Sequence, residues 1–515
     1  MPARTRDLLG VLFLGLLVLV GFLGGAMLIS GPNPDFFART FDVASPYGSL
    51  IHRDVVMAVR LFSSLCVAAG LFAILALAFP GRLMKFAEWA REKTQSGLTR
   101  RRGVICVAVF LVLFSAIAYA GAFRIGFHSD DFAWMESTEK TTQDPGHIFS
   151  LSQSHFFRPV TFLYHTVNFN LFRKNPYALH ISGVALHGLA ALFIFLVALQ
   201  LSDRVYLAIT AALLFAAYPV SSRSVMWISG SEIVFAGLIY LSAFYLFLLY
   251  LDRKKLAYYI LSLILFIFGV MAKEAVISLA LATFLAGFLL SKRASRWSGL
   301  PFVVVAVFFI FFQMSVQAGS FLLEENIYSL NTGIMIKNYG GYTWASLIPL
   351  GHRMLVLYPF LKGLSLVVLA VLIPVVLVRG SNLLRFLVLW YLILLAPFMA
   401  FNLPVQPRYL YLPSFALSIL IAWVLGVLYT KVFASSPYRK LVFAAGFCLL
   451  ITAAFVQIHT AAVKMRYETI QMKEYIEDVQ SDPQKMRDLQ EGKLPADSPL
   501  TYDHLKSALR LKPSL

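Results

Sequence analysis

Charged residues are scarce in this chain. Only 14% of its 515 residues are Asp, Glu, Lys or Arg, whereas 59% are hydrophobic. A water-soluble domain needs roughly a quarter of charged residues to cover its surface. Acidic residues are especially few, at 26 against 44 Lys and Arg. This balance excludes a water-soluble fold.

Cysteine is rare as well, and internal repeats are missing. Cys66, Cys106 and Cys448 lie within apolar runs, with no CxxC spacing and no histidine partner nearby. They indicate small packing residues and argue against a disulfide framework or a thiolate metal site. The lack of a repeated unit argues against a solenoid.

Long apolar runs dominate the sequence. As helices that rise 1.5 Å per residue, they can cross a hydrocarbon core roughly 30 Å thick. The first run is long and lacks a clear small-residue cleavage site, so we expect it to be retained as a span. The sequence predicts an all-α, polytopic bundle of about thirteen spans: 8–30, 54–79, 103–122, 179–200, 205–219, 231–251, 256–272, 275–291, 298–318, 363–379, 385–401, 411–430 and 440–459.

The basic residues fall mostly in short loops between these runs. With the N-terminus inside, the strongly basic loops share one side: 80–102, 252–255, 292–297, 379–385 and 431–440. This is the positive-inside pattern, so the net charge of +18 indicates topology and not nucleic-acid binding. A span at 341–361 would invert everything after it. We therefore expect a re-entrant or surface helix there.

Two adjacent acids stand in the outer loop that follows the third predicted span. Asp130 and Asp131 would repel each other, and such pairs usually hold a metal, share a proton or face cations. An ordinary solvated acidic turn is the alternative interpretation. The pair permits a divalent metal, but no spacing here demands one, so no cofactor and no metal ligand is assigned.

Two further polar motifs share the predicted outer face. Lys273 and Glu274 stand between two apolar runs with almost no loop, so they should pair or line a cavity; a hairpin in which they neutralise each other is the alternative. Arg408 lies among Tyr409 and Tyr411 at a membrane interface, which suits phosphate binding or an aromatic-belt anchor. Other polar residues on this face are His155, Arg158, Tyr164, His165, Trp227, Glu232 and Arg353.

Five short motifs carry a family resemblance. They are Arg158–Asn168 (RPVTFLYHTVN), Asn175–His180 (NPYALH), Trp227–Gly230 (WISG), Ala272–Glu274 (AKE) and Arg408–Ser414 (RYLYLPS). Their order resembles the GT-C superfamily of polyprenyl-phosphate-sugar-dependent glycosyltransferases. The nearest similarity is to the membrane half of the transmembrane-and-tetratricopeptide O-mannosyltransferases and to dolichyl-phosphate-mannose protein mannosyltransferases. Tyr218–Ser224 (YPVSSRS) departs from the histidine-rich motif of those enzymes, which leaves the sugar and the acceptor open.

The resemblance implies a site on the outer loops. A transferase must take a proton from the acceptor hydroxyl, a role for Asp130 or Asp131 as general base. It must also stabilise a lipid-phosphate leaving group, a role for Arg158, Lys273, Arg408 and Arg353. Substrate-binding roles then fall to His155, Tyr164, His165, Trp227, Glu232, Glu274, Tyr409 and Tyr411.

The expected protein is thus a membrane hexosyltransferase with inversion at the anomeric carbon. Its donor would be undecaprenyl- or dolichyl-phosphate-linked, and its acceptor a protein, lipid or glycan in the bacterial periplasm or the endoplasmic reticulum lumen. We expect a two-span extension with a basic cytoplasmic loop at 1–102, a GT-C-like core at 103–460 and a polar, helical, non-cytoplasmic tail at 461–515. Two alternatives remain: an oligosaccharide ligase or polymerase with a lipid-diphosphate donor, and a lipid or glycan transporter, against which the one-sided polar residues argue.

Overall fold

The computed structural model describes residues 101–151, 156–291, 296–317, 329, 331–347, 360–494 and 498–510. The predicted extension 1–102, with its spans 8–30 and 54–79, therefore lies almost entirely outside the described residues. In the described ranges the chain is helical and forms no β-strand, and an isolated antiparallel bridge joins Leu151 and Phe157. The all-α prediction is confirmed for this part of the chain.

Every predicted span from 103–122 onward contains a helix. These helices are α5 (Arg101–Ala118), α8 (Pro176–Ser202), α9 (Val205–Ala216), α11 (Ser231–Arg253), α12 (Leu256–Ala272), α13 (Ser278–Leu289), α14 (Leu300–Gln317), α18 (Phe360–Arg379), α19 (Asn382–Leu395), α20 (Pro413–Leu428) and α21 (Pro437–Ser481). Six helical stretches among the described residues, those of α8, α9, α11, α18, α20 and α21, are long and apolar enough to cross a membrane. The others are shorter, so membrane insertion is supported and the count of thirteen is not confirmed.

Local sequence signals set the ends of the central helices. Asn175 caps α8, because its side chain accepts a hydrogen bond from the backbone N–H of Tyr177 at 3.0 Å and Pro176 occupies the first turn. Asp203 and Lys254, with φ of 52° and 58°, end α8 and α11 in the left-handed conformation. Short connections then return the chain antiparallel to the preceding helix.

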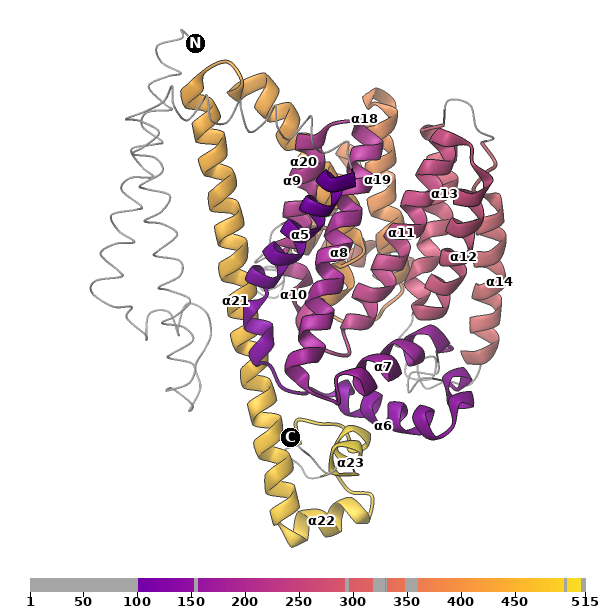
Figure 1. Cartoon of the computed structure of the whole chain (residues 1–515), viewed down its shortest axis with the longest axis vertical. Coiled ribbons are helices and arrows are strands. Elements are labelled where there is room, and N and C mark those ends of the chain that lie inside the picture. Colours follow the sequence, from indigo (N-terminus) through magenta and orange to yellow (C-terminus); the bar gives the residue numbers. More distant parts are fainter. Residues whose placement is uncertain are drawn as a thin grey trace, which may run out of the picture.

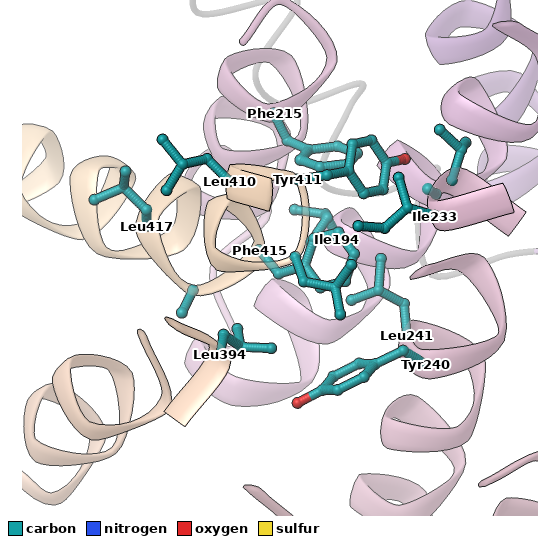
Figure 2. Close-up of a cluster of buried hydrophobic side chains, with 14 of the residues drawn as sticks. Ile194, Phe215, Ile233, Tyr240, Leu241, Leu394, Leu410, Tyr411, Phe415 and Leu417 are labelled. Atoms are coloured by element: carbon teal, nitrogen blue, oxygen red, sulfur yellow. The ribbon is translucent and has the colours of Figure 1, made fainter. Parts of the chain in front are cut away.

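The core lies where α8, α9, α11 and α20 meet. Tyr411 and Phe415 of the α20 region pack edge-on against Phe215 of α9, with ring centroids 5.6 and 5.5 Å apart (Figure 2). The Tyr411 hydroxyl shares a hydrogen bond of 3.1 Å with Nδ1 of His187 on α8. The other ring nitrogen of His187 lies 3.2 Å from the carbonyl oxygen of Ala216, so this buried polar group is satisfied between helices.

The chain between the helices gathers at the two ends of the bundle. Figure 1 shows α6 (Asp130–Gln143) and α7 (Pro159–Leu171) lying across one end. The α9–α11, α12–α13 and α19–α20 connections reach the same end. The loops 252–255, 379–385 and 431–440 lie at the opposite end because α11, α18 and α20 run away from the first end. The predicted separation from the distinctive polar residues is therefore present in the fold for these three basic loops.

The predicted boundary between core and tail falls inside one helix. Helix α21 has 45 residues, runs along the bundle and continues past the end that carries α6 and α7 (Figure 1). Its apolar composition stops near 460, but the polar residues that follow are also good helix formers, so the backbone continues unbroken. Helices α22 (Pro483–Gln490) and α23 (Tyr502–Arg510) then bring the chain back to α6.

Segment 341–361 is described only in part. Residues 341–347 form the end of α16 (Thr332–Leu347), which packs against α18, and 348–359 lie outside the described residues. The Asn338 side chain on α16 donates hydrogen bonds of 2.8 Å to the carbonyl oxygens of Met399 and Phe401. This helix is thereby fixed to the α19–α20 connection.

The crossing of α5 and α8 depends on a glycine, and it supplies a stability test. A Cβ added at Gly188 would lie 2.7 Å from the Cα of Val112, and a backbone atom cannot move aside. We expect Gly188→Val to lower the free energy of unfolding by about 1–3 kcal/mol, as overpacking does. Gly446→Val is the matched control, because nothing lies within 4 Å of a Cβ there. Equal melting temperatures of the two variants in detergent would contradict the close packing.

Candidate functional site

A cavity of about 470 Å³ opens at the end of the bundle that carries α6 and α7. Its walls come from α6, the start of α7, the turn before α11, the end of α12, the α19–α20 connection and α23. Eight of the predicted site residues line it: Asp130, Arg158, Trp227, Glu232, Lys273, Glu274, Arg408 and Tyr409. Residues far apart in sequence thus share one chamber.

Asp130 presents its carboxylate to this cavity from the first turn of α6. Its side chain is 43% exposed, and Oδ1 accepts a hydrogen bond of 3.1 Å from the Ser129 hydroxyl. Ser129 has φ of 44°, a conformation that costs a non-glycine residue free energy and that often marks functional sites. The loop is therefore held in an unfavourable conformation directly before the exposed acid.

Asp131 points the other way and is fully buried. Its Oδ1 accepts hydrogen bonds from the backbone N–H of Ser229, at 2.7 Å, and from the Ser229 hydroxyl, while Oδ2 accepts one of 2.8 Å from the N–H of His128. Burial raises the pKa of Asp131 to about 6, although these hydrogen bonds act in the opposite direction. Above that pH the residue is an anion whose bonds join the loop before α6 to the turn before α11.

The two adjacent acids thus have separate environments. This argues against a metal ion held by both carboxylates, which the sequence permitted. Successive residues of a helix point about 100° apart. The donors that occupy Asp131 leave it unavailable as a second ligand beside Asp130. Within the described ranges, no group of three or more His, Cys, Asp or Glu side chains could hold a metal ion.

Four charged side chains that line the cavity form a network, in which both cations are buried and both carboxylates are partly exposed. Arg158 donates to Oε2 of Glu274 from Nε at 3.0 Å and from Nη2 at 2.8 Å, and its Nη1 lies 3.5 Å from Oε1 of Glu232. Lys273 pairs with Glu232 and not with its neighbour Glu274. Two cations and two carboxylates therefore neutralise one another across α7, α11 and the α12–α13 turn, which contradicts a simple Lys–Glu hairpin.

Arg408 is held differently from the other cavity cations. Its guanidinium lies 5.4 Å from the ring centroid of Trp227 and 5.0 Å from that of Tyr409, and Nη2 donates to the Tyr409 hydroxyl at 3.2 Å. Its Nε is buried with no hydrogen-bond partner. In the described part of the chain, Arg408 forms no ion pair with a carboxylate, so its charge is available to an anion.

An aromatic wall adjoins Arg408. The Tyr409 ring stacks on Phe398 and Phe401 with centroids 4.9 and 5.0 Å apart, and all three rings line the cavity together with Leu403. Phe398 and Phe401 were missed because the sequence shows them only as part of an apolar run. The cavity is thus cationic and apolar on one side and acidic near Asp130.

Several predicted site residues lie behind the cavity wall. The Tyr164 hydroxyl donates to Ser231 at 2.9 Å, and the His165 ring stacks on Trp134 with centroids 4.4 Å apart. Burial lowers the pKa of His165 to about 4, so this ring is neutral near pH 7. Tyr411 belongs to the core described above. His155 and Arg353 lie outside the described residues.

The C-terminal segment contributes residues that sequence reasoning missed. Thr501, Asp503 and His504 line the cavity although they follow the last predicted span by about 40 residues. Leu505 and Ala508 of α23 pack into a second small core with Phe132 and Met135 of α6. The helical spacing of Leu505, Ala508 and Leu509 could have indicated a packed face, but not its partner.

No family model and no curated protein matches the chain. Among solved structures, it is similar to the archaeal oligosaccharyltransferase AglB from Archaeoglobus fulgidus in complex with an inhibitory peptide and a dolichol-phosphate. The identity is 15% and the TM-score 0.46, over 79% of this chain and 61% of AglB, which is less than two thirds of its length. It is also similar to ArnT from Cupriavidus metallidurans bound to undecaprenyl phosphate, with 12% identity and a TM-score of 0.47 over 80% of this chain and 85% of ArnT. These values are low, and the resemblance by itself carries no conclusion about function.

The two aspartates should respond differently to amide substitution. In Asp131→Asn, one amide hydrogen must face a backbone N–H donor, so we expect a loss of about 1–3 kcal/mol of stability. Asp130→Asn should leave the melting temperature unchanged, because the exposed carboxylate stabilises little. Thermal unfolding of both variants in the same detergent checks this. A larger decrease in melting temperature for Asp130→Asn would mean that Asp130, and not Asp131, is the structural acid.

The charge network should show strong coupling. Lys273→Met leaves Glu232 with less compensation, and breaking a buried pair typically costs about 3–5 kcal/mol. The double variant Lys273→Met, Glu232→Gln should be more stable than the sum of the single losses predicts. A double-mutant cycle from denaturant unfolding measures the coupling. Purely additive effects would mean that the two groups do not interact.

Proposed function

We propose that the chain is a GT-C-type membrane glycosyltransferase that moves a sugar from a polyprenyl phosphate to a hydroxyl acceptor. One observation carries this proposal: a single cavity holds an exposed carboxylate, Asp130, and a cation without a carboxylate partner among the described residues, Arg408. Transfer from a lipid phosphate needs both a base and an anion site.

The proposed step is a single displacement. As the acceptor oxygen bonds to the anomeric carbon, its proton passes to the Asp130 carboxylate. The bond between that carbon and the phosphate oxygen breaks, and the oxygen keeps the electron pair. Arg408 stabilises the charge that develops there. Attack from the face opposite the leaving group inverts the anomeric carbon.

The remaining cavity groups suit the substrate's other parts. Oε2 of Glu232 is buried without a hydrogen-bond partner in the described structure, and it could accept a sugar hydroxyl. Arg158 and Lys273 are already compensated by Glu232 and Glu274, so we give them a supporting role in phosphate binding. The wall formed by Phe398, Phe401, Leu403 and Tyr409 offers apolar surface to the first prenyl unit beside the phosphate.

We further propose that this end of the bundle faces the periplasm or lumen, since the basic loops 252–255, 379–385 and 431–440 lie at the other end. We also propose a mannosyltransferase-like specificity, a protein, lipid or glycan acceptor, and the bacterial inner membrane or the endoplasmic reticulum membrane as the location.

The central test is donor turnover by the purified full chain. Undecaprenyl phosphates that carry mannose, glucose or arabinose are offered with Ser/Thr-rich peptides and alkyl glycosides, and release of undecaprenyl phosphate is measured by mass spectrometry. We expect release from at least one donor, and a decrease of about 10²–10⁴-fold in Asp130→Asn. Lipid-diphosphate donors are assayed in parallel, and turnover of those alone would favour the ligase alternative.

Arg408 should control binding of the carrier itself. A hydrogen bond to a charged group is worth about 1.5–3 kcal/mol, so Arg408→Met should weaken undecaprenyl phosphate binding roughly 10- to 100-fold. Arg223→Met is the matched control, because Arg223 lies 5.7 Å from the same Trp227 ring but pairs with Glu468. Native mass spectrometry measures both affinities. Equal losses would show that general positive charge, and not the Arg408 site, attracts the lipid.

A further inference from the structure

The C-terminal helix is built into the cavity wall. Helix α23 packs along α6, where Leu505 is fully buried, Arg510 pairs with Glu136 at 3.2 Å and the Ser507 hydroxyl also donates to Glu136. The segment is thus anchored by apolar contacts and by charge. Its first turn carries His504, which lies beside Asp130 of α6.

His504 contacts the proposed base directly. Its Nε2 lies 3.3 Å from Oδ1 of Asp130, and its Nδ1 lies 3.4 Å from the Ser129 hydroxyl. The His504 side chain is only 13% exposed, compared with 43% for Asp130. The ring presents the edge that carries both nitrogens to these two groups, which limits its rotation.

The two oxygens of Asp130 therefore differ. Oδ1 accepts the hydrogen bond of the Ser129 hydroxyl and lies within ion-pair distance of the His504 ring, whereas Oδ2 has no partner in the described part of the chain. A carboxylate fixed at one oxygen cannot rotate freely about its last bond. The other oxygen, Oδ2, is then the one that can accept a proton.

We propose that His504 is a positioning residue for Asp130, so that the C-terminal helix completes the active site. The ring holds Oδ1 and leaves Oδ2 as the atom that takes the acceptor's proton. This inference rests on the proposed function for its catalytic consequence. It differs from a purely structural role of α23, which Leu505 and the Glu136 contacts already fulfil.

The kinetic test uses the best donor from the panel above. We expect His504→Ala to lower kcat about 10- to 100-fold with little change in KM for that donor, because lipid binding lies at Arg408. His504→Gln should keep part of the rate, since its amide can donate to Oδ1. Added imidazole should partly restore His504→Ala. Unchanged kcat, or a loss that neither imidazole nor glutamine restores, would overturn the proposal.

A control and a substrate-free readout complete the test. Leu505→Ala loosens the same helix, so any loss it causes should not respond to imidazole. Carbodiimide labelling of Asp130, followed by peptide mass spectrometry, should be faster in His504→Ala than in the wild-type protein. Equal labelling rates in His504→Ala and the wild type would overturn the proposed contact, even if the wild type turned over no donor. Faster labelling of His504→Ala without any donor turnover by the wild type would count against the proposed function alone.

Discussion

The compensated charge network of Arg158, Glu232, Lys273 and Glu274 is the interaction on which the site depends. It ties the start of α7 to the start of α11 and to the turn after α12, three segments that bound the cavity. Charges in such a low-dielectric place must be paired, and each pair here uses a partner from another element. The apolar bundle can therefore end in a polar chamber without leaving an unpaired charge in its floor.

This network also explains why the cavity cations differ in how far their charge is neutralised. Arg158 and Lys273 form ion pairs with Glu232 and Glu274. Arg408 instead lies against the rings of Trp227 and Tyr409. Aromatic faces hold a guanidinium in place without cancelling its charge. Among the described residues, the same chamber thus combines a neutralised charge network with a cation, Arg408, that can attract an anion.

The position of the acid depends on a second set of contacts. Asp131 binds Ser229 and His128 and so fixes the loop from which Asp130 projects. On the cavity side, Ser129 and His504 hold one oxygen of Asp130. Asp131, which the sequence presents as one of two adjacent acids, thus has a structural role: it positions the loop that carries Asp130.

The sequence by itself determined the helical class, the approximate positions of the described helices and the separation of three basic loops from the distinctive polar residues. Those features follow from hydrophobicity and charge along the chain, which are local properties. It also placed Asp130, Arg158, Lys273 and Arg408 on one face. Only the tertiary structure decided that Asp130 and not Asp131 faces the cavity, that Lys273 pairs with Glu232, and that His504 returns from the tail to Asp130. Each of these depends on a side-chain direction or on a contact between residues remote in sequence, and no local pattern encodes which distant partner a helix will meet.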